Sequence, residues 1–190
     1  MTIGVLALQG AFRAHIDKLD GLGAEAIEIR RPNELDDVDA LVMPGGESTT
    51  MSMLLDSSGL ADPIADRIEN GMAVFGTCAG LILLADEILD GRPDQRSFGR
   101  LDITVKRNGY GRQVESFETE ITTTVTDDSI HAVFIRAPQV VSVGAEVEVL
   151  ATARGDAVLV RQGNALGAAF HPELSESNEI HRLFVESIAY

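Results

Sequence analysis

The sequence contains a single cysteine, Cys78, among its 190 residues. One thiol cannot form an internal disulfide, and without companion thiolates it cannot form a multi-cysteine metal site. The 4 histidines are scattered along the chain, and we expect no metal site from them. Cys78 is therefore either a small buried apolar residue or a reactive thiol in a reducing compartment.

Long apolar segments are also missing from the sequence. The longest ones, such as residues 81–85, fall far short of the roughly 20 apolar residues that cross a membrane. The apolar N-terminal segment has no basic residues before it and resembles a strand more than a signal peptide. We therefore expect the protein in the cytoplasm.

Basic residues are few, with 15 Lys and Arg against 30 Asp and Glu, and the net charge is −15. Binding to nucleic acid or to an anionic membrane surface needs a basic footprint, so neither partner is expected. A chain of 190 residues is typical of one domain. We expect residues 1–190 to form a single domain whose core needs no disulfide or structural metal.

Short apolar segments alternate with longer amphipathic ones through the first half of the chain. Strands separated by helices indicate a doubly wound α/β sheet flanked by helices, whose ligands bind at the carboxyl ends of the strands. The predicted strands are residues 3–8, 26–29, 40–43 and 73–75. The predicted helices are residues 12–22, 49–56 and 60–70, with another after Gly80.

The second half consists mostly of short strand-like segments broken by Gly, Asp and Pro, which we expect to add antiparallel strands to the sheet. Residues 178–188 are predicted to form a closing helix, with Ser177 as its cap. Residues 90–97 are predicted to be a surface loop. The strand-like segments are residues 117–125, 133–135, 140–143, 147–152, 157–161 and 165–170.

The strongest local signal is Gly-Thr-Cys-Ala-Gly at residues 76–80, which follows an apolar strand and precedes a helical segment. Small residues on both sides of Cys78 permit a strained strand-to-helix turn that presents the thiol above the sheet. The start of a helix also favours thiolate over thiol. A buried cysteine beside closely packed glycines is the alternative, and this motif alone does not exclude it.

His171, Pro172 and Glu173 form the second signal, directly after a strand-like segment. A thiol nucleophile needs a base, and the base needs an acceptor that fixes its tautomer. Pro172 fixes the local φ and excludes a helix, so the two functional side chains stay close. A histidine in an ordinary polar turn is the simpler alternative.

The third signal is Met-Pro-Gly-Gly-Glu-Ser-Thr-Thr at residues 43–50, between a buried strand and a helix. Paired glycines let a backbone N–H, here that of Gly46, approach a ligand as an oxyanion hole requires. A glycine turn followed by a helix cap at Ser48 or Thr49 is the alternative. The two interpretations are compatible.

Together the three signals place a nucleophile, a base and an oxyanion donor at strand ends of one sheet. With these motifs the sequence resembles the class I glutamine amidotransferases, whose glutaminase domain carries a Cys-His-Glu triad. Within that class it is most similar to the glutaminases of pyridoxal 5'-phosphate synthases, through Leu-Gln-Gly and Arg-Asn-x-x-Gly-Arg-Gln. The matching blocks are residues 4–11, 44–50, 76–80, 107–113 and 170–173.

The resemblance implies a role for each site residue. Cys78 is the expected nucleophile, His171 the base and then the acid, and Glu173 the residue that orients the imidazole. The N–H groups of Gly46 and Ala79 are the expected oxyanion donors. Contacts to glutamine are expected from Gly46, Glu47, Ser48, Arg107, Ile135 and Arg136.

Two of these substrate contacts have alternatives. Arg107 can bind a carboxylate bidentately, but it could equally form a surface ion pair in this acidic protein. Ile135 and Arg136 could act through backbone groups alone. Among the histidines, His15 lies in a predicted helix and either faces a partner or is solvated, while His131 and His181 are predicted to be surface residues.

The resemblance further implies hydrolysis of L-glutamine to glutamate and ammonia through a γ-glutamyl thioester, with no cofactor. The ammonia would pass to a synthase subunit in a hetero-oligomeric complex, which makes pyridoxal 5'-phosphate from a pentose phosphate and a triose phosphate. Gln9 and Gly10 are expected to couple the site to that partner. The alternatives are a glutaminase of histidine or purine biosynthesis and a non-enzymatic, redox-sensing cysteine protein.

Overall fold

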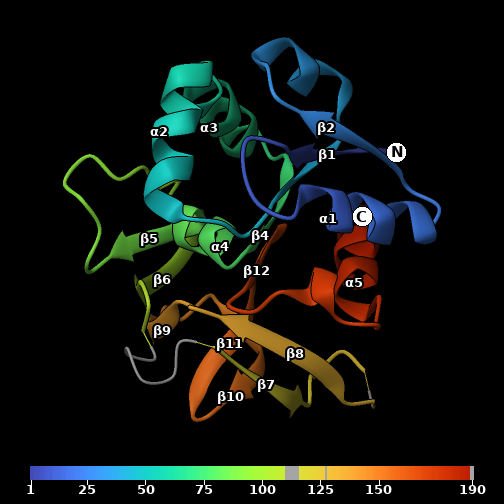
Figure 1. Cartoon of the computed structure of the whole chain (residues 1–190), viewed down its shortest axis with the longest axis vertical. Coiled ribbons are helices and arrows are strands. Elements are labelled where there is room, and N and C mark those ends of the chain that lie inside the picture. The colour runs from blue at the N-terminus through green and yellow to red at the C-terminus, as the bar shows by residue number, and fades with distance from the viewer. Residues whose placement is uncertain (110–115, 127, 189–190) are drawn as a thin grey trace.

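A mixed seven-stranded sheet forms the centre of the protein (Figure 1). The computed structural model describes residues 1–109, 116–126 and 128–188. Neighbouring strands run parallel from β12 to β2, whereas β10 and β11 add antiparallel pairs at one edge. The strands are, in spatial order, β10 (Glu148–Ala153), β11 (Asp156–Gln162), β12 (Ala165–Ala168), β4 (Ala73–Thr77), β3 (Ala40–Met43), β1 (Thr2–Leu6) and β2 (Glu25–Ile29).

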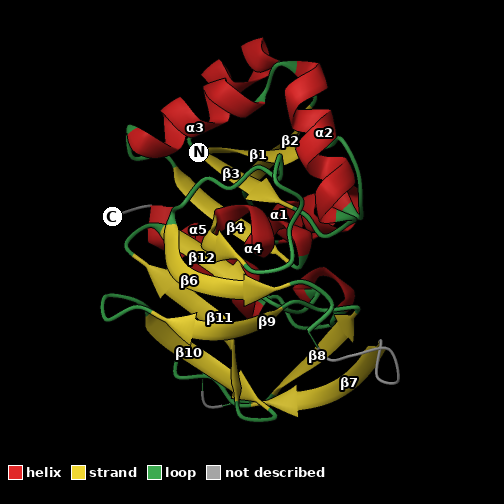
Figure 2. Ribbon diagram, turned by 90° about the vertical axis from the view of Figure 1, so that its left-hand side faces the viewer, coloured by secondary structure: helices red, strands yellow, loops and turns green. Residues whose placement is uncertain are grey.

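Helices cover both faces of this sheet, which confirms the predicted α/β class (Figure 1, Figure 2). Helices α1 (Phe12–Gly21) and α5 (Glu179–Ile188) pack together on one face. The other face carries α2 (Ser48–Ser58), α3 (Ala61–Glu69) and α4 (Ala79–Leu84). The described part of the chain also contains two short 3-10 helices, η1 (Pro32–Asp37) and η2 (Pro172–Leu174).

Helix boundaries follow local capping chemistry. Helix α2 ends at Gly59, whose φ of 73° is a left-handed conformation that glycine adopts without a Cβ penalty. At the start of α5 the Ser177 hydroxyl accepts the N–H of Glu179 at 3.2 Å, so the predicted cap at Ser177 is confirmed.

The expectation that all later strands join the central sheet is wrong for three of the predicted segments. Residues 117–125 and 133–135 instead form a separate hairpin of β7 (Ser116–Ile121) and β8 (Ile130–Ile135). Residues 140–143 become β9 (Gln139–Val143), which pairs with β6 (Leu101–Lys106) and β5 (Ala85–Ile88) in a three-stranded sheet. Residues 165–170 become β12, which does join the central sheet; it pairs antiparallel with β11, as predicted, but parallel with β4.

Strands β5 and β6 were not among the predicted strands. The helix predicted after Gly80 ends at Leu84, and the chain passes directly into β5. Residues 81–85 are all buried, and a fully buried apolar segment does not show by its periodicity where a helix becomes a strand. Strand β6 alternates buried and less buried side chains, so its sequence did carry the period-two signal.

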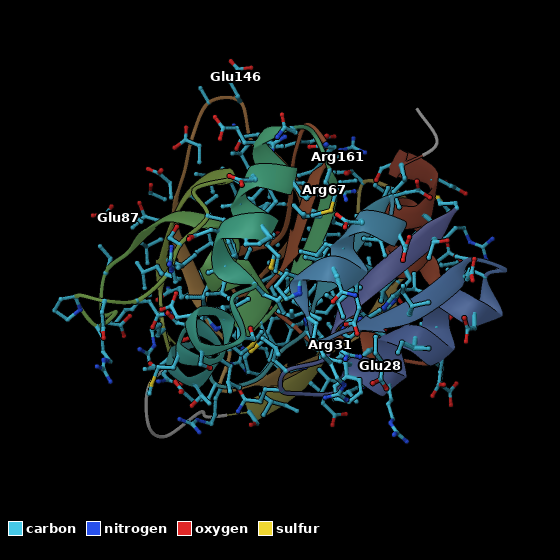
Figure 3. All side chains as sticks on the ribbon, turned by 90° about the horizontal axis from the view of Figure 1, so that it is seen from above. Glu28, Arg31, Arg67, Glu87, Glu146 and Arg161 are labelled. Carbon is cyan, nitrogen blue, oxygen red and sulfur yellow. The ribbon has the colours of Figure 1, made fainter. Side chains whose placement is uncertain are left out.

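Among the described residues Glu173 is the one buried Asp, Glu, Lys or Arg, and the labelled Glu87 and Glu146 lie on the outside of the molecule (Figure 3). Arg67 is partly buried and joins α3 to the η1 segment by donating to the carbonyls of Leu35 and Val38 at 2.5 and 2.6 Å. Within the described ranges, none of the helices combines the length and the apolar character that a membrane span requires.

Candidate active site

Four predicted segments of the site meet at one edge of the central sheet. Strands β1, β3, β4 and β12 are adjacent and parallel, so their carboxyl ends lie together. Residues 9–10 follow β1, residues 45–46 follow β3, Cys78 follows β4 and His171 lies shortly after β12. The direction of winding reverses between β1 and β3, and such switch points are where open α/β sheets bind ligands.

Cys78 occupies a strained turn between β4 and α4, with φ 50° and ψ −102°. Positive φ is uncommon in residues with a side chain and is held only by the surrounding structure. A Cβ at Gly76 would lie 2.5 Å from the Gly80 carbonyl, and one at Gly80 would overlap the carbonyl of Met43. The glycines therefore allow the turn to close, and Ala79, the other predicted oxyanion donor, begins α4.

His171 and Glu173 form a buried pair beside this turn. His171 Nδ1 lies 2.8 Å from Glu173 Oε1, and the His171 backbone N–H donates to the carbonyl of Val133 at 2.9 Å. The prediction that Pro172 excludes a helix is wrong, because Pro172 begins the 3-10 helix η2, where a proline N–H is not needed. The tight turn of η2 brings the carboxylate back to the imidazole. Because the ionised carboxylate only accepts, Nδ1 carries a proton and Nε2 is left to exchange a proton with the thiol.

The electrostatics of the pair favour its charged form. Burial alone would lower the pKa of His171, but hydrogen bonding and charge interactions with Cys78 and Glu173 outweigh it and raise the pKa to about 10. Burial would raise the pKa of Glu173, yet the hydrogen bond from His171 and the nearby His15 bring it below its usual value. The raised pKa means that the imidazolium form of His171 is favoured beside the thiol.

The glycine strip after β3 lies between His171 and the segment after β1. A Cβ at Gly45 would overlap the His171 ring, so only glycine fits there. Gly10, with φ 85°, packs against the carbonyl of Gly45. The side-chain oxygen of Gln9 accepts the backbone N–H of Glu47 at 3.2 Å. Gln9 and Gly10 thus contact the strip itself.

The cap of α2 is Glu47, so the predicted cap at Ser48 or Thr49 is wrong. The Glu47 carboxylate accepts the N–H of Thr49 at 3.1 Å and that of Thr50 at 2.7 Å. Two oxygens on a longer side chain satisfy two helix-start donors that one hydroxyl could not satisfy together. Burial would raise the pKa of Glu47, but these bonds hold it below its usual value.

A cleft of about 260 Å³ opens beside the Cys78 thiol. Arg107, on the loop after β6, donates from Nη1 to the Thr49 hydroxyl at 2.9 Å, and its Nη2 lies 3.3 Å from Glu47 Oε1. The ion pair considered for Arg107 therefore exists, and the same guanidinium lines the cleft. All the predicted glutamine contacts line it, namely Gly46, Glu47, Ser48, Arg107, Ile135 and Arg136.

Ile135 approaches the thiol through its backbone, and Arg136 lines the same cleft. The carbonyl oxygen of Ile135 lies 3.9 Å from Cys78 Sγ. Arg136 has a φ of 46°, an uncommon conformation for a residue with a side chain. This geometry favours the backbone alternative for the pair.

Ile82 and Asn108 also line the cleft, although neither was a predicted site residue. Ile82 follows Cys78 by one helical turn, a spacing that places it near the thiol. Asn108 belongs to the Arg-Asn-x-x-Gly-Arg-Gln block and has a φ of 45°. Residues 110–113 of that block lie outside the described residues.

Two histidines are buried behind the site, contrary to expectation. His181 was predicted at the surface and is fully buried, and His15 neither faces outward nor is solvated. Helices α1 and α5 pack together and cover both rings, with His15 one turn before the buried Leu19. His15 Nε2 lies 3.4 Å from Glu173 Oε2. His131 is exposed, as predicted.

This fold and site define a glutamine amidotransferase with a cysteine at a strand-to-helix turn. A solved structure described as a glutamine amidotransferase is 48% identical to the chain, covers 99% of each and superposes with a TM-score of 0.91. Another from Thermotoga maritima, at 12% identity and a TM-score of 0.61, covers 91% of this chain and 76% of its own and shares only the fold.

The chain belongs to the SNO glutamine amidotransferase family, which matches residues 5–190. Among its relatives are proteins named pyridoxal 5'-phosphate synthase subunit PdxT from Mycobacteroides abscessus and Nocardioides sp.. Each is 56% identical to this chain, and each alignment covers 98% of the chain and 96% of the relative.

Proposed function

We propose that this chain is the glutaminase subunit of a pyridoxal 5'-phosphate synthase and hydrolyses L-glutamine to L-glutamate and ammonia. The observation that carries this proposal is the placement of Cys78, on its strained turn, in one cleft with the buried His171–Glu173 pair. Amide hydrolysis by a nucleophile needs a thiol, a base and a group that orients the base. The pathway follows from the PdxT relatives.

The reaction begins when the Cys78 thiolate attacks the side-chain amide carbon of glutamine. A C–S bond forms, the carbonyl electrons move to oxygen, and the N–H groups of Gly46 and Ala79 bind that oxyanion. His171 then gives its proton to the amide nitrogen, the C–N bond breaks and ammonia leaves. Water deprotonated by His171 attacks the γ-glutamyl thioester, releasing glutamate and restoring the thiolate.

Substrate recognition uses the rest of the cleft. Gly46, Glu47, Ser48, Ile135 and Arg136 line it, and the Ile135 carbonyl faces the thiol. The Arg107 guanidinium can bind the α-carboxylate of glutamine in a fork. Its contacts with Glu47 and Thr49 hold the guanidinium in the cleft before the substrate binds.

The product of the reaction, ammonia, indicates what kind of partner this chain needs. Ammonia in water is rapidly protonated and diffuses away, so a synthase that consumes it must lie against this chain. We infer a hetero-oligomeric complex in the cytoplasm, in which residues 1–190 act as one glutaminase domain. Gln9 and Gly10, which contact the glycine strip, are the residues that couple docking to the site.

An electrophilic glutamine analogue should attach at Cys78, and free glutamine should slow that attachment. Any accessible thiol reacts with an electrophile, whereas competition by the substrate locates the thiol within the glutamine site. Mass spectrometry of the protein in complex with its synthase measures both the position and the rate of labelling.

Iodoacetamide, which lacks the amino-acid part, is the matched control reagent. Labelling by the analogue that glutamine cannot slow would remove the proposed glutamine site and favour the redox-sensing alternative. A complex with a histidine or purine synthase, but none with the pyridoxal 5'-phosphate synthase, would reassign the pathway and leave the chemistry intact.

Replacing Glu173 with glutamine should lower turnover, with a loss roughly 10- to 100-fold smaller than that caused by removing the nucleophile. Glu173 helps to raise the pKa of His171. Without the carboxylate that pKa falls, so the imidazolium loses its proton at lower pH. The basic limb of the pH profile of kcat/KM should therefore move to lower pH.

Glu176→Gln is the matched control, because it changes a carboxylate three residues away that lies outside the cleft. It should keep the wild-type profile. A Glu173→Gln enzyme with wild-type turnover and an unchanged basic limb would show that Glu173 does not orient His171.

A further inference from the structure

The Glu173 carboxylate has a second side that the triad does not use. Its Oε1 accepts from His171, whereas Oε2 is fully buried and has no hydrogen-bond partner among the described residues. The titratable group nearest to Oε2 is the ring of His15, whose Nε2 lies 3.4 Å away. A buried carboxylate oxygen without a donor is costly, so this contact needs an explanation.

His15 is held in place by three further groups. Its Nδ1 lies 2.9 Å from Nε2 of His181 on α5, and its Nε2 lies 3.3 Å from the hydroxyl of Thr77, the residue before Cys78. The Phe75 ring packs edge-on against both histidines. All of these side chains are fully buried, so the His15 ring is fixed between α1, α5 and β4.

These contacts select one tautomer for each ring. Glu173 is ionised and can only accept, so the His15 nitrogen facing it must carry the proton. His15 Nδ1 is then a bare acceptor, and it takes the N–H of His181 Nε2. His181 Nδ1 is left bare, which agrees with its lack of any partner among the described residues. The N–H group on His181 Nε2 therefore faces His15, and the N–H group on His15 Nε2 faces Glu173.

We propose that His15 is a positioning residue for the glutaminase reaction: a proton on its Nε2, 3.4 Å from Glu173 Oε2, stabilises the ionised carboxylate through an electrostatic contact and keeps it aimed at His171. His181 supports this role by fixing the tautomer of His15. The inference rests on the proposed function of the Cys78, His171 and Glu173 triad, and it extends that triad to side chains on α1 and α5.

The charges around His15 are consistent with a neutral ring that donates. The titratable groups facing it are Glu173 on η2, His181 on α5 and, beyond Glu173, His171. Lys18, one turn along α1, faces His181 and bonds the carbonyls of residues 175–177. Burial lowers the pKa of His15 to about 4 despite the opposing charge of Glu173.

The first test reads the tautomer directly in the unmodified protein. Nitrogen-15 NMR of histidine-labelled chain, bound to its unlabelled synthase, distinguishes a protonated from a bare ring nitrogen. His15 should show protonated Nε2 and bare Nδ1 throughout the range between roughly pH 5 and 8. The opposite tautomer, or an imidazolium near neutral pH, would overturn the proposal without any variant having to fold.

The second test is the pH profile of kcat/KM in the complex with three variants. His15→Leu removes the N–H group that faces Glu173, so the pKa of Glu173 rises. As the pH is lowered, the variant therefore loses activity at a higher pH than the wild type does. A shift of the acid limb by one pH unit corresponds to about a tenfold loss of kcat/KM below that limb. His15→Gln, whose amide can donate in place of Nε2, should restore the wild-type limb.

Leu19→Ala is the matched control, because it removes buried packing from the same helix face without touching Glu173. It should lower thermal stability and leave the acid limb in place. His181→Leu should shift the limb in the same direction as His15→Leu but by less. A His15→Leu profile like that of Leu19→Ala, with the wild type active, would refute the positioning role alone, whereas an inactive wild-type complex would refute the proposed function.

Discussion

Cys78→Ala should abolish glutamine hydrolysis, with a loss on the order of 10⁴-fold or more, while the protein keeps its fold. The chain contains no other thiol that could form the acyl-enzyme. The Cys78 backbone, which donates to Ala168 and accepts from Ile82, is unchanged by the substitution. Glutamate release by the complex measures the loss, and circular dichroism with thermal unfolding checks the fold.

Cys78→Ser is the companion variant, because it keeps the size and a hydroxyl but supplies a much weaker nucleophile. It should also be inactive. Synthase activity driven by added ammonia should survive in both complexes, since only the glutamine half-reaction is removed. Normal hydrolysis by Cys78→Ala would eliminate the cysteine mechanism outright.

The isolated chain should be a poor glutaminase that becomes active when its synthase docks. Losing one oxyanion donor typically costs about 100- to 1,000-fold in rate, so one misdirected N–H is enough for an off state. The peptide between Gly45 and Gly46 can rotate with little steric cost because neither residue has a Cβ. Gln9 and Gly10 touch this strip and are the expected route from docking to chemistry.

Gln9→Ala should reduce the stimulation by the synthase, because the bond from the Glu47 N–H to the Gln9 side chain is lost. Measuring ammonia release with and without the synthase gives the size of the stimulation. Gln162→Ala is the matched control, since Gln162 also accepts a backbone N–H, that of Asp102, in a different part of the protein. Full activity of the chain alone would refute gating, and unchanged stimulation in Gln9→Ala would exclude Gln9 from it.

The hydrophobic pattern of the first half predicted its structure well because each segment there carries its own period. Residues 40–43 were predicted as a strand and have the same bounds as β3, and α1 begins at the predicted Phe12. In the second half the strands after β6 were located, but not their partners. Pairing is decided by contacts between distant residues, such as β12 against β4, which a local pattern does not encode.

The residues of the site also divide into those that sequence motifs predict and those that only the tertiary structure reveals. Cys78, His171 and Glu173 stand in short motifs whose residue types predict a nucleophile, a base and an orienting carboxylate, and the resemblance that these motifs carry predicts a glutamine amidotransferase. Only the tertiary structure could place His15 and His181 behind that carboxylate, because they come from opposite ends of the chain and meet where α1 packs on α5. A short motif fixes which reactive side chains stand close together in the sequence. The burial of a side chain, and which ring nitrogen of a buried histidine carries the proton, are decided only when distant helices pack over it.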